Sequence, residues 1–539
     1  MLSDAAKLTP NNEAVVSLHQ NIRLSYAELD RRVRNVAAGL VELGIEPGER
    51  VGIWAPNCVE WMIAQYATAR AGIILVNINP AYRIAEVEYA LNKVGCSAII
   101  LARSFKSSDY FGMIKKLSPN LFSAGSKETK IPTLRHGILI DDGGDKKHGL
   151  LKFLDVETMG SPESHKLVKE IELSLQPEDP INIQFTSGTT GSPKGATLTH
   201  HNILNNGYFV GEGIKLTDKD RICVPVPLYH CFGMVMGNLA ALTHGATIIY
   251  PAAGFEPEAT LKAVEDEKCT ALYGVPTMFI AMLASDAIEK TNFSSLRTGI
   301  MAGSPCPVDV MKRVLTDMQM PEVTNCYGMT ETSPVSFQSS TDTSLEKRVS
   351  TVGKVHPHLE VKVINEDGKV VLRGVQGELC TRGYSVMSGY WGDADATASA
   401  VDANGWMHTG DLVIIDSDDY ANITGRSSDV IIRGGENIYP KEIEDHFRRH
   451  SSVQDVQVFG LPDEKFGEVV CAYIILNPDE DITEEGITAW LREQISHYKI
   501  PKHVRIVQDY PQTVTGKAQK FLMRKAMIDE LQLREIETA

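Results

Sequence analysis

Hydrophobic residues recur at regular spacings through the first hundred positions of the chain. Ser25 and Glu28 form a capping-box pattern, and apolar residues then follow at steps of three and four up to Gly44. This spacing predicts an amphipathic helix that ends before Gly44. Further apolar runs predict strands at 50–54, 73–76 and 98–101, with helices at 59–70 and 84–94. Strands that alternate with helices favour a doubly wound, parallel α/β layer.

The pattern changes several times along the rest of the chain. Between 103 and 176 it weakens into charged loops, so this stretch is interpreted as a surface connection. The α/β alternation resumes at Ile181 and persists to about Ile300, where a β-rich stretch punctuated by glycine follows. A new α+β pattern begins after 425. We therefore predict an α/β protein in which a large N-terminal domain (1–425) combines doubly wound subdomains with a β-rich subdomain. A small α+β C-terminal domain (426–539) follows it.

Composition narrows the classes of protein that fit this pattern. The 539 residues are 43% hydrophobic and 23% charged, which is typical of a globular chain with several folding units. The net charge of −16 disfavours a protein that coats nucleic acid or an anionic membrane. Apolar stretches such as 71–76 and 234–242 are too short or interrupted to cross a bilayer, and residues 1–12 lack a signal or transit pattern.

The cysteines indicate the compartment. All nine are scattered, odd in number and without a C-x-x-C spacing. This arrangement predicts neither a disulfide framework nor a zinc site, and it favours buried thiols in a reducing compartment. The cytoplasm and the mitochondrial matrix both meet that condition.

A loop after the predicted strand at 181–185 gives the first indication of chemistry. Glycines permit unusual backbone angles, hydroxyls and amides donate hydrogen bonds, and a lysine adds positive charge, so the loop is suited to hold a polyphosphate. It is not a Walker A loop, because Pro-Lys stands where that motif has Gly-Lys. The alternative is a flexible surface loop. Its residues are Thr186, Ser187, Gly188, Thr189, Thr190, Gly191, Ser192, Pro193, Lys194 and Gly195.

Later motifs have a physical rationale of their own. Tyr327 offers a planar ring for stacking on adenine, and Glu331 offers the hard oxygen ligand that Mg²⁺ prefers. Asp411 can accept both hydroxyls of a ribose, and Arg426 suits a ribose or a phosphate. Taken alone, the tyrosine would be a core aromatic and the glutamate a solvated or capping acid. The aspartate would belong to a turn, and the arginine to a structural salt bridge.

The ordered set of these motifs resembles the adenylate-forming superfamily of acyl-CoA synthetases, nonribosomal adenylation domains and luciferases. The loop at 186–195 is similar to that family's phosphate loop, and Tyr327-Gly328-Met329-Thr330-Glu331 to its aromatic-Gly-x-Thr-Glu motif. Further on, the chain resembles the family at Thr409-Gly410-Asp411, at the hinge motif Gly425-Arg426 and at the terminal Thr515-Gly516-Lys517. The resemblance covers residues 25 to 525.

The resemblance implies roles for particular residues. Lys517 would reach the attacking carboxylate and the α-phosphate, with Thr330 and Glu331 as further catalytic residues; an exposed lysine is the alternative. His230 would line the acyl entrance and position substrate, and a satisfied core histidine is the alternative. The adenine-flanking loop would be Gly303, Ser304 and Pro305, and the coenzyme A path would pass Gly434 and Gly435, which an ordinary hairpin turn also explains.

One position departs from the family pattern. Many relatives carry Lys or Asp two residues after the hinge arginine, whereas this chain has Ser428, followed by Asp429. The resemblance implies a mobile C-terminal domain that rotates about this hinge between two half-reactions. Serine at the hinge bears on the rate of that rotation.

The expected function is that of a two-step ligase. ATP with Mg²⁺ and a small-molecule carboxylic acid would give an acyl-adenylate and pyrophosphate, and coenzyme A would then give a thioester and AMP. Resemblance to the medium-chain branch of fatty acyl-CoA synthetases, some of them mitochondrial, implies an apolar pocket that includes Phe232, Met234, Met301 and Val335.

Several alternatives stay open at this point. The acid could be aromatic, the acceptor could be a carrier-protein thiol, or the chain could be a catalytically silent nucleotide-binding homologue. Nucleic acid and an integral membrane segment are not expected as partners. The acyl chain length, the oligomeric state, including a homo-oligomer, and the presence of an N-terminal leader are left open.

Overall fold

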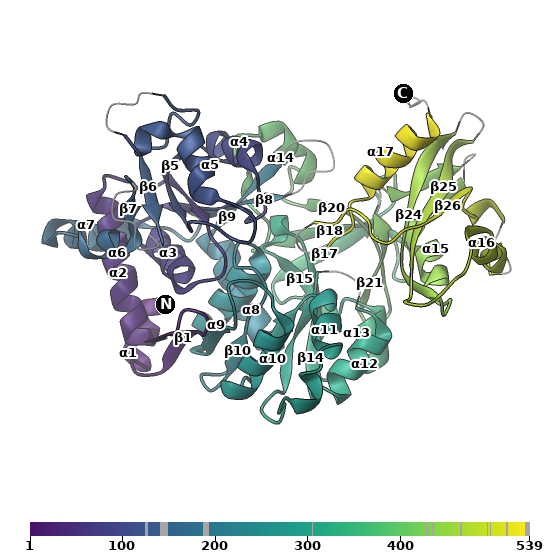
Figure 1. Cartoon of the computed structure of the whole chain (residues 1–539), viewed down its shortest axis with the longest axis horizontal. Coiled ribbons are helices and arrows are strands. Elements are labelled where there is room, and N and C mark those ends of the chain that lie inside the picture. The colour runs from purple at the N-terminus through teal and green to yellow at the C-terminus, as the bar shows by residue number, and fades with distance from the viewer. Residues whose placement is uncertain are drawn as a thin grey trace. The chain divides into compact units, whose positions relative to one another are not determined.

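The computed structural model of the chain divides into two compact units (Figure 1). The first unit is Met1–Glu360 with Thr381–Met407, and the second is Val361–Cys380 with His408–Ala539. The described residues are 1–123, 128–140, 149–186, 193–303, 306–426, 429–433, 436–463, 466–492, 494–495, 497–513 and 516–533. The predicted site residues that lie outside them are Ser187, Gly188, Thr189, Thr190, Gly191, Ser192, Ser304, Pro305, Ser428, Gly434 and Gly435.

An eight-stranded sheet forms one layer of the first unit, in the order β19-β9-β8-β4-β3-β5-β6-β7. The strands from β8 to β7 are parallel, whereas β9 pairs antiparallel with both β8 and β19. Their bounds are β3 Arg50–Trp54, β4 Ile74–Asn77, β5 Cys96–Leu101, β6 His136–Leu139, β7 Leu151–Lys152, β8 Pro180–Thr186, β9 Lys194–Thr199 and β19 Gly389–Tyr390.

A nine-stranded sheet forms the other layer, in the order β16-β15-β14-β13-β12-β10-β11-β1-β2. It is parallel from β1 to β14, and antiparallel strands complete both edges. Their bounds are β1 Glu13–Ser17, β2 Ile22–Ser25, β10 Arg221–Cys223, β11 Thr247–Tyr250, β12 Ala271–Gly274, β13 Thr298–Ala302, β14 Glu322–Gly328, β15 Val335–Gln338 and β16 Lys354–Val355.

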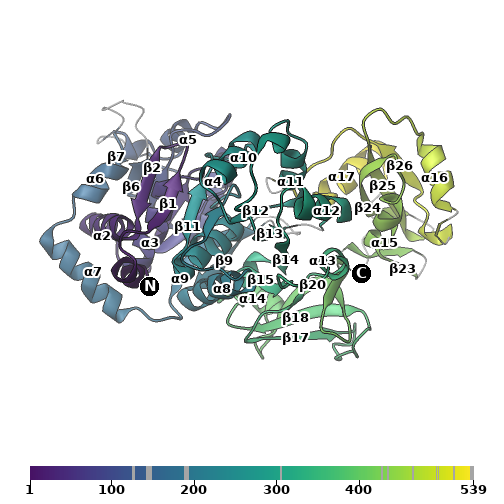
Figure 2. The same ribbon diagram turned by 90° about the horizontal axis from the view of Figure 1, so that it is seen from below.

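Helices of the first unit pack on and between these sheets (Figure 2). The α-helices are α1 Leu2–Leu8, α2 Tyr26–Glu42, α3 Val59–Arg70, α4 Ile84–Val94, α5 Tyr110–Leu117, α6 Phe153–Thr158, α7 Pro162–Ser174, α8 His200–Gly213, α9 Ala240–His244, α10 Pro257–Asp266, α11 Pro276–Leu283, α12 Val308–Thr316, α13 Leu345–Ser350 and α14 Ala394–Ala400. The short helices are η1 Pro119–Leu121, η2 Phe232–Leu239, η3 Ile288–Lys290 and η4 Thr330–Thr332.

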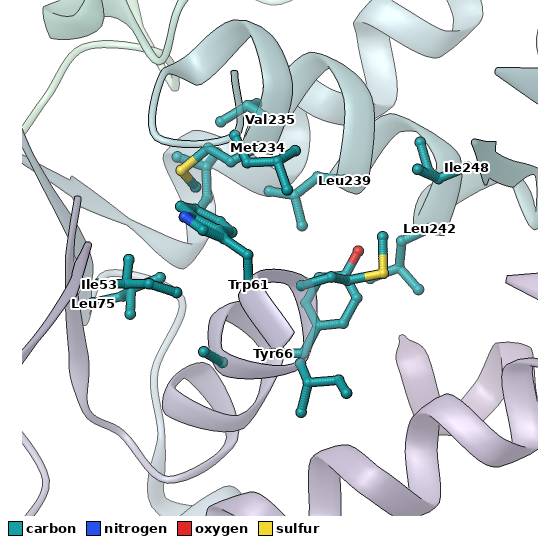
Figure 3. Close-up of a cluster of buried hydrophobic side chains, with 14 of the residues drawn as sticks. Ile53, Trp61, Tyr66, Leu75, Met234, Val235, Leu239, Leu242 and Ile248 are labelled. Carbon is teal, nitrogen blue, oxygen red and sulfur yellow. The ribbon is translucent and has the colours of Figure 1, made fainter. Parts of the chain in front are cut away.

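The largest hydrophobic core joins the two layers. Figure 3 shows Trp61 and Tyr66 of α3 among side chains of η2 and of the strands β3, β4 and β11. The segment η2 is a π-helix of eight residues, all of them buried. π-Helical segments are rare and frequently lie at functional sites, so this element of the core is a candidate part of the functional site.

Local sequence patterns account for several element boundaries. The Ser25 hydroxyl accepts the Glu28 backbone N–H, and the Glu28 carboxylate accepts the Ser25 N–H, so the predicted capping box starts α2. The predicted bounds of β3, α3 and α4 match the structure. The Thr483 hydroxyl accepts the Gly486 N–H at the start of α16 (Glu484–Arg492).

The interpretation of 103–176 as a surface connection is wrong. This stretch contains α5, β6, β7, α6 and α7, and it buries Tyr110, Ile114, Leu117, Ile138 and Phe153. The strand β6 has only four residues and pairs with β5 on its inner side. Charged loops surround these short elements, and they obscured the hydrophobic spacing that belongs to them.

The second unit contains two further sheets. One has the order β17-β18-β20-β21, and the other the order β23-β22-β25-β24, with β26 paired to β25. Two hydrophobic clusters pack helices on the latter sheet. The bounds are β17 Leu359–Ile364, β18 Gly377–Gly383, β20 Met407–Ile415, β21 Ala421–Arg426, β22 Ile431–Arg433, β23 Glu436–Ile438, β24 Val453–Asp463, β25 Gly467–Leu476, β26 His503–Ile506, α15 Pro440–Phe447, η6 His497–Lys499 and α17 Lys520–Leu531.

The predicted fold class is confirmed: an α/β protein with a large N-terminal part, a β-rich sheet and a small α+β part at its end. The domain boundary at 425 stays a prediction. Within the described residues, we find no helix with the length and apolar character needed to cross a membrane.

Candidate active site

The described ends of the predicted phosphate loop form a β-hairpin. Thr186 is the last residue of β8, Lys194 is the first residue of β9, and the two are partners in the antiparallel register. The Thr186 hydroxyl donates to the Lys194 carbonyl at 3.5 Å, and the Tyr89 hydroxyl donates to the Pro193 carbonyl at 3.1 Å. Paired strands therefore hold both ends of the loop at one place.

Lys194 lies next to an aromatic ring that connects it to the next motif. Its Nζ is 5.1 Å from the ring centroid of Tyr390, and the Tyr390 hydroxyl donates to Glu331 Oε1 at 2.9 Å. Burial and the neighbouring Glu331 carboxylate raise the pKa of Tyr390, so its hydroxyl stays protonated. The Lys194 ammonium, the neutral Tyr390 side chain and the Glu331 carboxylate are thus linked one to the next. The face of the Tyr390 ring stabilises the ammonium.

A cavity of about 160 Å³ lies at this position. Lys194 and Tyr390 line it, together with Tyr89, Lys93 and Trp391. The sequence analysis missed Tyr390 and this cavity, because Glu331 and Tyr390 are 59 positions apart. The only local signal was the adjacent pair of aromatic residues, Tyr390 and Trp391.

Glu331 is a buried carboxylate on the short helix η4. Its backbone carbonyl accepts the Met387 N–H at 2.9 Å, which fixes the helix against the segment that carries Tyr390. Thr330 starts the same helix, and Tyr327 precedes it on β14 with its ring 6.2 Å from that of Phe337. The structure therefore links the carboxylate of Glu331, the predicted metal ligand, to Lys194 through Tyr390.

Two glycines of the predicted motifs occupy positions that disfavour a side chain. A Cβ at Gly328 would lie 1.7 Å from the Pro334 carbonyl oxygen, so this position excludes a side chain. Gly303 follows β13 with φ +97°, a left-handed conformation that favours glycine. The next two residues of its predicted loop lie outside the described residues.

The His230 ring is neutral and can donate one hydrogen bond. Burial lowers its pKa to about 4, so the ring is neutral near pH 7. Its Nδ1 accepts the Phe232 backbone N–H at 3.2 Å. A neutral imidazole that accepts at one nitrogen carries its hydrogen on the other, so Nε2 is a donor. A neutral ring that donates from Nε2 can position a substrate oxygen. Its Nδ1 already accepts a backbone hydrogen bond, so this nitrogen is not suited to act as a general base.

The predicted acyl pocket divides between two hydrophobic clusters. Phe232, Met234 and Val335 belong to the same buried cluster, and the Phe232 ring stacks on that of Tyr273 at 5.9 Å. Met301 lies on β13 in the other cluster, whereas its neighbours Ile300 and Ala302 lie in the first. Alternate residues of a strand face opposite sides of a sheet. The structure therefore does not bring Met301 together with the other three residues.

Asp411 and Arg426 are directly joined in the second unit. They are register partners on β20 and β21, and Arg426 Nε donates to Asp411 Oδ1 at 2.9 Å. Asp411 is buried, and its backbone N–H donates to the Thr409 hydroxyl. The salt bridge that the sequence analysis offered as the alternative for Arg426 is thus present. It also orients the carboxylate of Asp411.

Lys517 is an exposed residue on a tight turn of the second unit. The Thr513 N–H donates to the Lys517 carbonyl at 2.7 Å, and the Lys517 N–H donates to the Thr513 hydroxyl at 3.0 Å. Gly516 has φ +79°, which favours glycine at this turn. The turn holds the backbone of the predicted catalytic lysine. Ser428, Gly434 and Gly435 lie outside the described residues.

Comparison with protein families finds two matches. Residues 2–391 match the family "AMP-binding enzyme", and residues 442–517 match "AMP-binding enzyme C-terminal domain". The first match contains the predicted phosphate loop, His230 and Glu331, and the second ends at Lys517, whereas Asp411 and Arg426 lie between the two matches.

Individual relatives are similar over nearly the whole chain. The mitochondrial medium-chain acyl-CoA ligase ACSF2 of Danio rerio is 46% identical over 97% of this chain and 87% of its own length. The human protein of that name is 42% identical over 99% of this chain and 88% of its own. The crystal structure of ATP-bound MatB from Rhodopseudomonas palustris is 28% identical, with a TM-score of 0.84 over 98% of this chain and 99% of that one.

Proposed function

The chain belongs to the family of AMP-binding enzymes, and from this membership we propose that it joins a medium-chain fatty acid to coenzyme A with ATP. The reaction proceeds through an acyl-adenylate and releases pyrophosphate and AMP. Identity of more than two fifths with medium-chain acyl-CoA ligases, over nearly the full chain, supports the substrate class. Those relatives are mitochondrial, which favours the matrix over the cytoplasm as the site of action.

One geometric observation carries the proposal. Lys194, at the base of the phosphate loop, contacts the Tyr390 ring, whose hydroxyl is bonded to the buried Glu331. A loop whose described end carries a cation, linked through a tyrosine to a buried carboxylate, is suited to a nucleoside triphosphate with its metal ion. The ends of a flexible surface loop would not be expected to lie beside these groups.

The chemistry requires no nucleophile from the protein. In the first step, a carboxylate oxygen of the acid attacks the α-phosphorus of ATP, and the bond to the β-phosphate oxygen breaks to release pyrophosphate. In the second step, the thiolate of coenzyme A attacks the acyl carbon, and AMP leaves with the electron pair of the broken acyl–oxygen bond. The protein contributes positioning and charge neutralisation.

Particular residues fit these tasks. Asp411, oriented by Arg426, accepts hydrogen bonds from the ribose hydroxyls. Lys517, presented by its turn, neutralises the charge that develops on the α-phosphate and the attacking carboxylate. His230 donates from Nε2 to an acyl oxygen. Phe232 and Met234 of the π-helix provide apolar surface for the chain.

The residues present fit a magnesium ion. Glu331 is a buried carboxylate, and the Tyr390 hydroxyl already holds one of its oxygens in place. Glu331 would hold the ion, which neutralises phosphate charge when bound. Around it, Tyr390 orients the carboxylate, and Lys194 adds a second positive charge to the phosphate end of the site.

The decisive experiment compares acids. The purified chain is incubated with ATP, Mg²⁺, coenzyme A and straight-chain acids from butanoate to octadecanoate, and the thioesters are quantified. The largest kcat/KM is expected for octanoate or decanoate. A higher kcat/KM for benzoate would favour an aromatic-acid ligase, and acid-dependent exchange of pyrophosphate into ATP without any coenzyme A thioester would favour loading of a carrier protein. Absence of both exchange and thioester would favour a catalytically silent homologue.

A further inference from the structure

Three potential metal ligands meet in the second unit, on two strands of which one, β20, also carries Asp411. They are Glu378 and Cys380 of β18 and His408 of β20. His408 Nδ1 is 3.3 Å from Glu378 Oε2 and 3.7 Å from Cys380 Sγ. All three ligand atoms lie within 4.8 Å of one another.

These separations match those of ligands around one ion. Bonds of about 2.0 Å to nitrogen and oxygen and about 2.3 Å to sulfur, at tetrahedral angles, place ligand atoms roughly 3.3 to 3.6 Å apart. The nitrogen–oxygen and sulfur–nitrogen distances fall at or near this range. All three separations are at most 4.8 Å, so binding would need side-chain movements of no more than about 1.5 Å.

The strands hold the ligands in place before any ion binds. Glu378 and Cys380 are two positions apart on β18, so they point to the same face of the sheet. The other carboxylate oxygen of Glu378 accepts the Gly410 N–H at 3.1 Å, which orients this side chain. Cys380 is buried, whereas His408 and Glu378 are 32% and 27% exposed, so an ion can enter from their side.

The cluster lies apart from the nucleotide residues. Burial alternates along β20, with His408 and Gly410 on the half-exposed face and Thr409 and Asp411 on the buried face. Asp411 therefore points away from the three ligands, although it follows His408 by only three positions. An ion here would not be the Mg²⁺ that accompanies ATP.

We infer that Glu378, Cys380 and His408 form a binding site for a thiophilic divalent cation of the Zn²⁺ class. Thiolate and imidazole ligands select Zn²⁺ over Mg²⁺ or Ca²⁺, and three protein ligands leave a fourth position for water. Binding displaces the thiol proton of Cys380 to solvent, so affinity falls as the pH is lowered. The ion would link β18 to β20, the strand that carries Asp411.

Cobalt(II) provides a direct test, since it occupies Zn²⁺ sites and absorbs light when a thiolate is a ligand. The full chain is freed of metal with a chelator and titrated with Co²⁺. A thiolate-to-cobalt band that saturates at one ion per chain is expected, and Zn²⁺ should abolish it. No band, or a band that survives in Cys380→Ala, would overturn the inference.

Matched variants separate ligation from folding. His408→Ala and Glu378→Gln change half-exposed side chains, and glutamine keeps an oxygen for the Gly410 N–H. Both should weaken Co²⁺ binding at least tenfold, because loss of a residue that only hydrogen-bonds to a metal ligand already costs that much affinity. Cys471→Ala, which changes another buried cysteine of the same unit, should leave the band unchanged. Loss of the band only in Cys471→Ala would place the ion elsewhere and refute the site.

Thermal stability gives a second measurement, which does not depend on the cobalt absorption band. A ligand that binds only the folded state stabilises it by an amount that grows with the logarithm of one plus the ratio of ligand concentration to Kd, so the melting temperature rises as ligand is added. Added Zn²⁺ should raise the melting temperature of the parent chain and of Cys471→Ala, but not that of His408→Ala. An equal rise in all three proteins would contradict the inference.

Discussion

Tyr390 illustrates how the surroundings of one side chain decide its role. Its ring lies beside the Lys194 ammonium, and its hydroxyl donates to Glu331. Burial raises its pKa, so it donates a proton in this hydrogen bond at all physiological pH values. We propose that it positions the carboxylate, because its hydroxyl is bonded to the proposed metal ligand.

Removing that hydroxyl is a specific test. Tyr390→Phe keeps the ring for Lys194 but deprives Glu331 of its donor. A hydrogen bond to a charged group contributes about 1.5–3 kcal/mol, so kcat/KM for ATP should fall roughly tenfold to a hundredfold. The measurement is acid-dependent exchange of pyrophosphate into ATP at several Mg²⁺ concentrations. Tyr208→Phe, at an exposed tyrosine, is the control and should retain full activity. Unchanged exchange in Tyr390→Phe would refute the positioning role.

Lys517 can be tested in the two half-reactions separately. Lys517→Ala should reduce adenylate formation by orders of magnitude, because no other group is proposed to neutralise the α-phosphate in that step. Thioester formation from a supplied acyl-adenylate should change little. Both rates are measured by product quantification, with Lys525→Ala on the exposed side of α17 as a control. Equal losses in both half-reactions would contradict the assignment.

At the scale of elements, the π-helix η2 connects the core to the proposed acyl surface. Buried amide side chains bond to it from both sides. Gln65 Nε2 donates to the Met234 carbonyl at 3.2 Å, and Gln184 Nε2 and Asn77 Nδ2 donate to the Met234 sulfur. The Tyr66 hydroxyl donates to the Asn238 carbonyl at 3.0 Å. Since buried polar groups need partners, these contacts favour one backbone position of η2.

Two glycines of the π-helix differ in the space around them. A Cβ at Gly233 would lie 2.5 Å from the Pro227 carbonyl oxygen, whereas a Cβ at Gly237 would meet the Val224 methyl groups at 3.3 and 3.4 Å. Gly233→Ala must therefore displace backbone and should lower the free energy of unfolding by about 1–3 kcal/mol. Gly237→Ala should lower it by less than about 1 kcal/mol.

The two glycine variants form a matched pair. Chemical denaturation gives the stability of each, and steady-state kinetics give KM for decanoate. Gly233→Ala should also raise this KM, because its displaced helix carries Phe232 and Met234. If both variants behave alike, the close approach at Gly233 is not what positions the helix.

At the scale of the whole molecule, the proposed reaction needs residues from both compact units. Lys194 and Glu331 belong to the first unit, and Asp411 and Lys517 to the second. We propose that the two half-reactions use different parts of the second unit and that the chain from Arg426 to Asp429 is a hinge. Rotation about this hinge would exchange Lys517 for Gly434 and Gly435, which would lie on the path of coenzyme A.

Restricting the backbone at the proposed hinge tests whether the rotation is needed. Proline fixes φ, so Ser428→Pro should restrict the change of backbone angles that a rotation requires. Pyrophosphate exchange should be retained, while overall thioester synthesis should fall at least tenfold. Each half-reaction serves as the control for the other. Full retention of both rates would show that the two steps do not depend on rotation at this position.

The sequence by itself determined the elements whose signals are local, and the structure confirms them. The capping box of α2, the bounds of β3, α3 and α4, and the order of the family motifs needed only neighbouring residues. Tertiary structure alone decided which distant residues meet. The Tyr390–Glu331 bond, the separation of Met301 from Phe232, and the cluster of Glu378, Cys380 and His408 all depend on strand pairing and sheet faces. Spacing along one segment contains no information about the register of another, so these contacts could not be predicted from it.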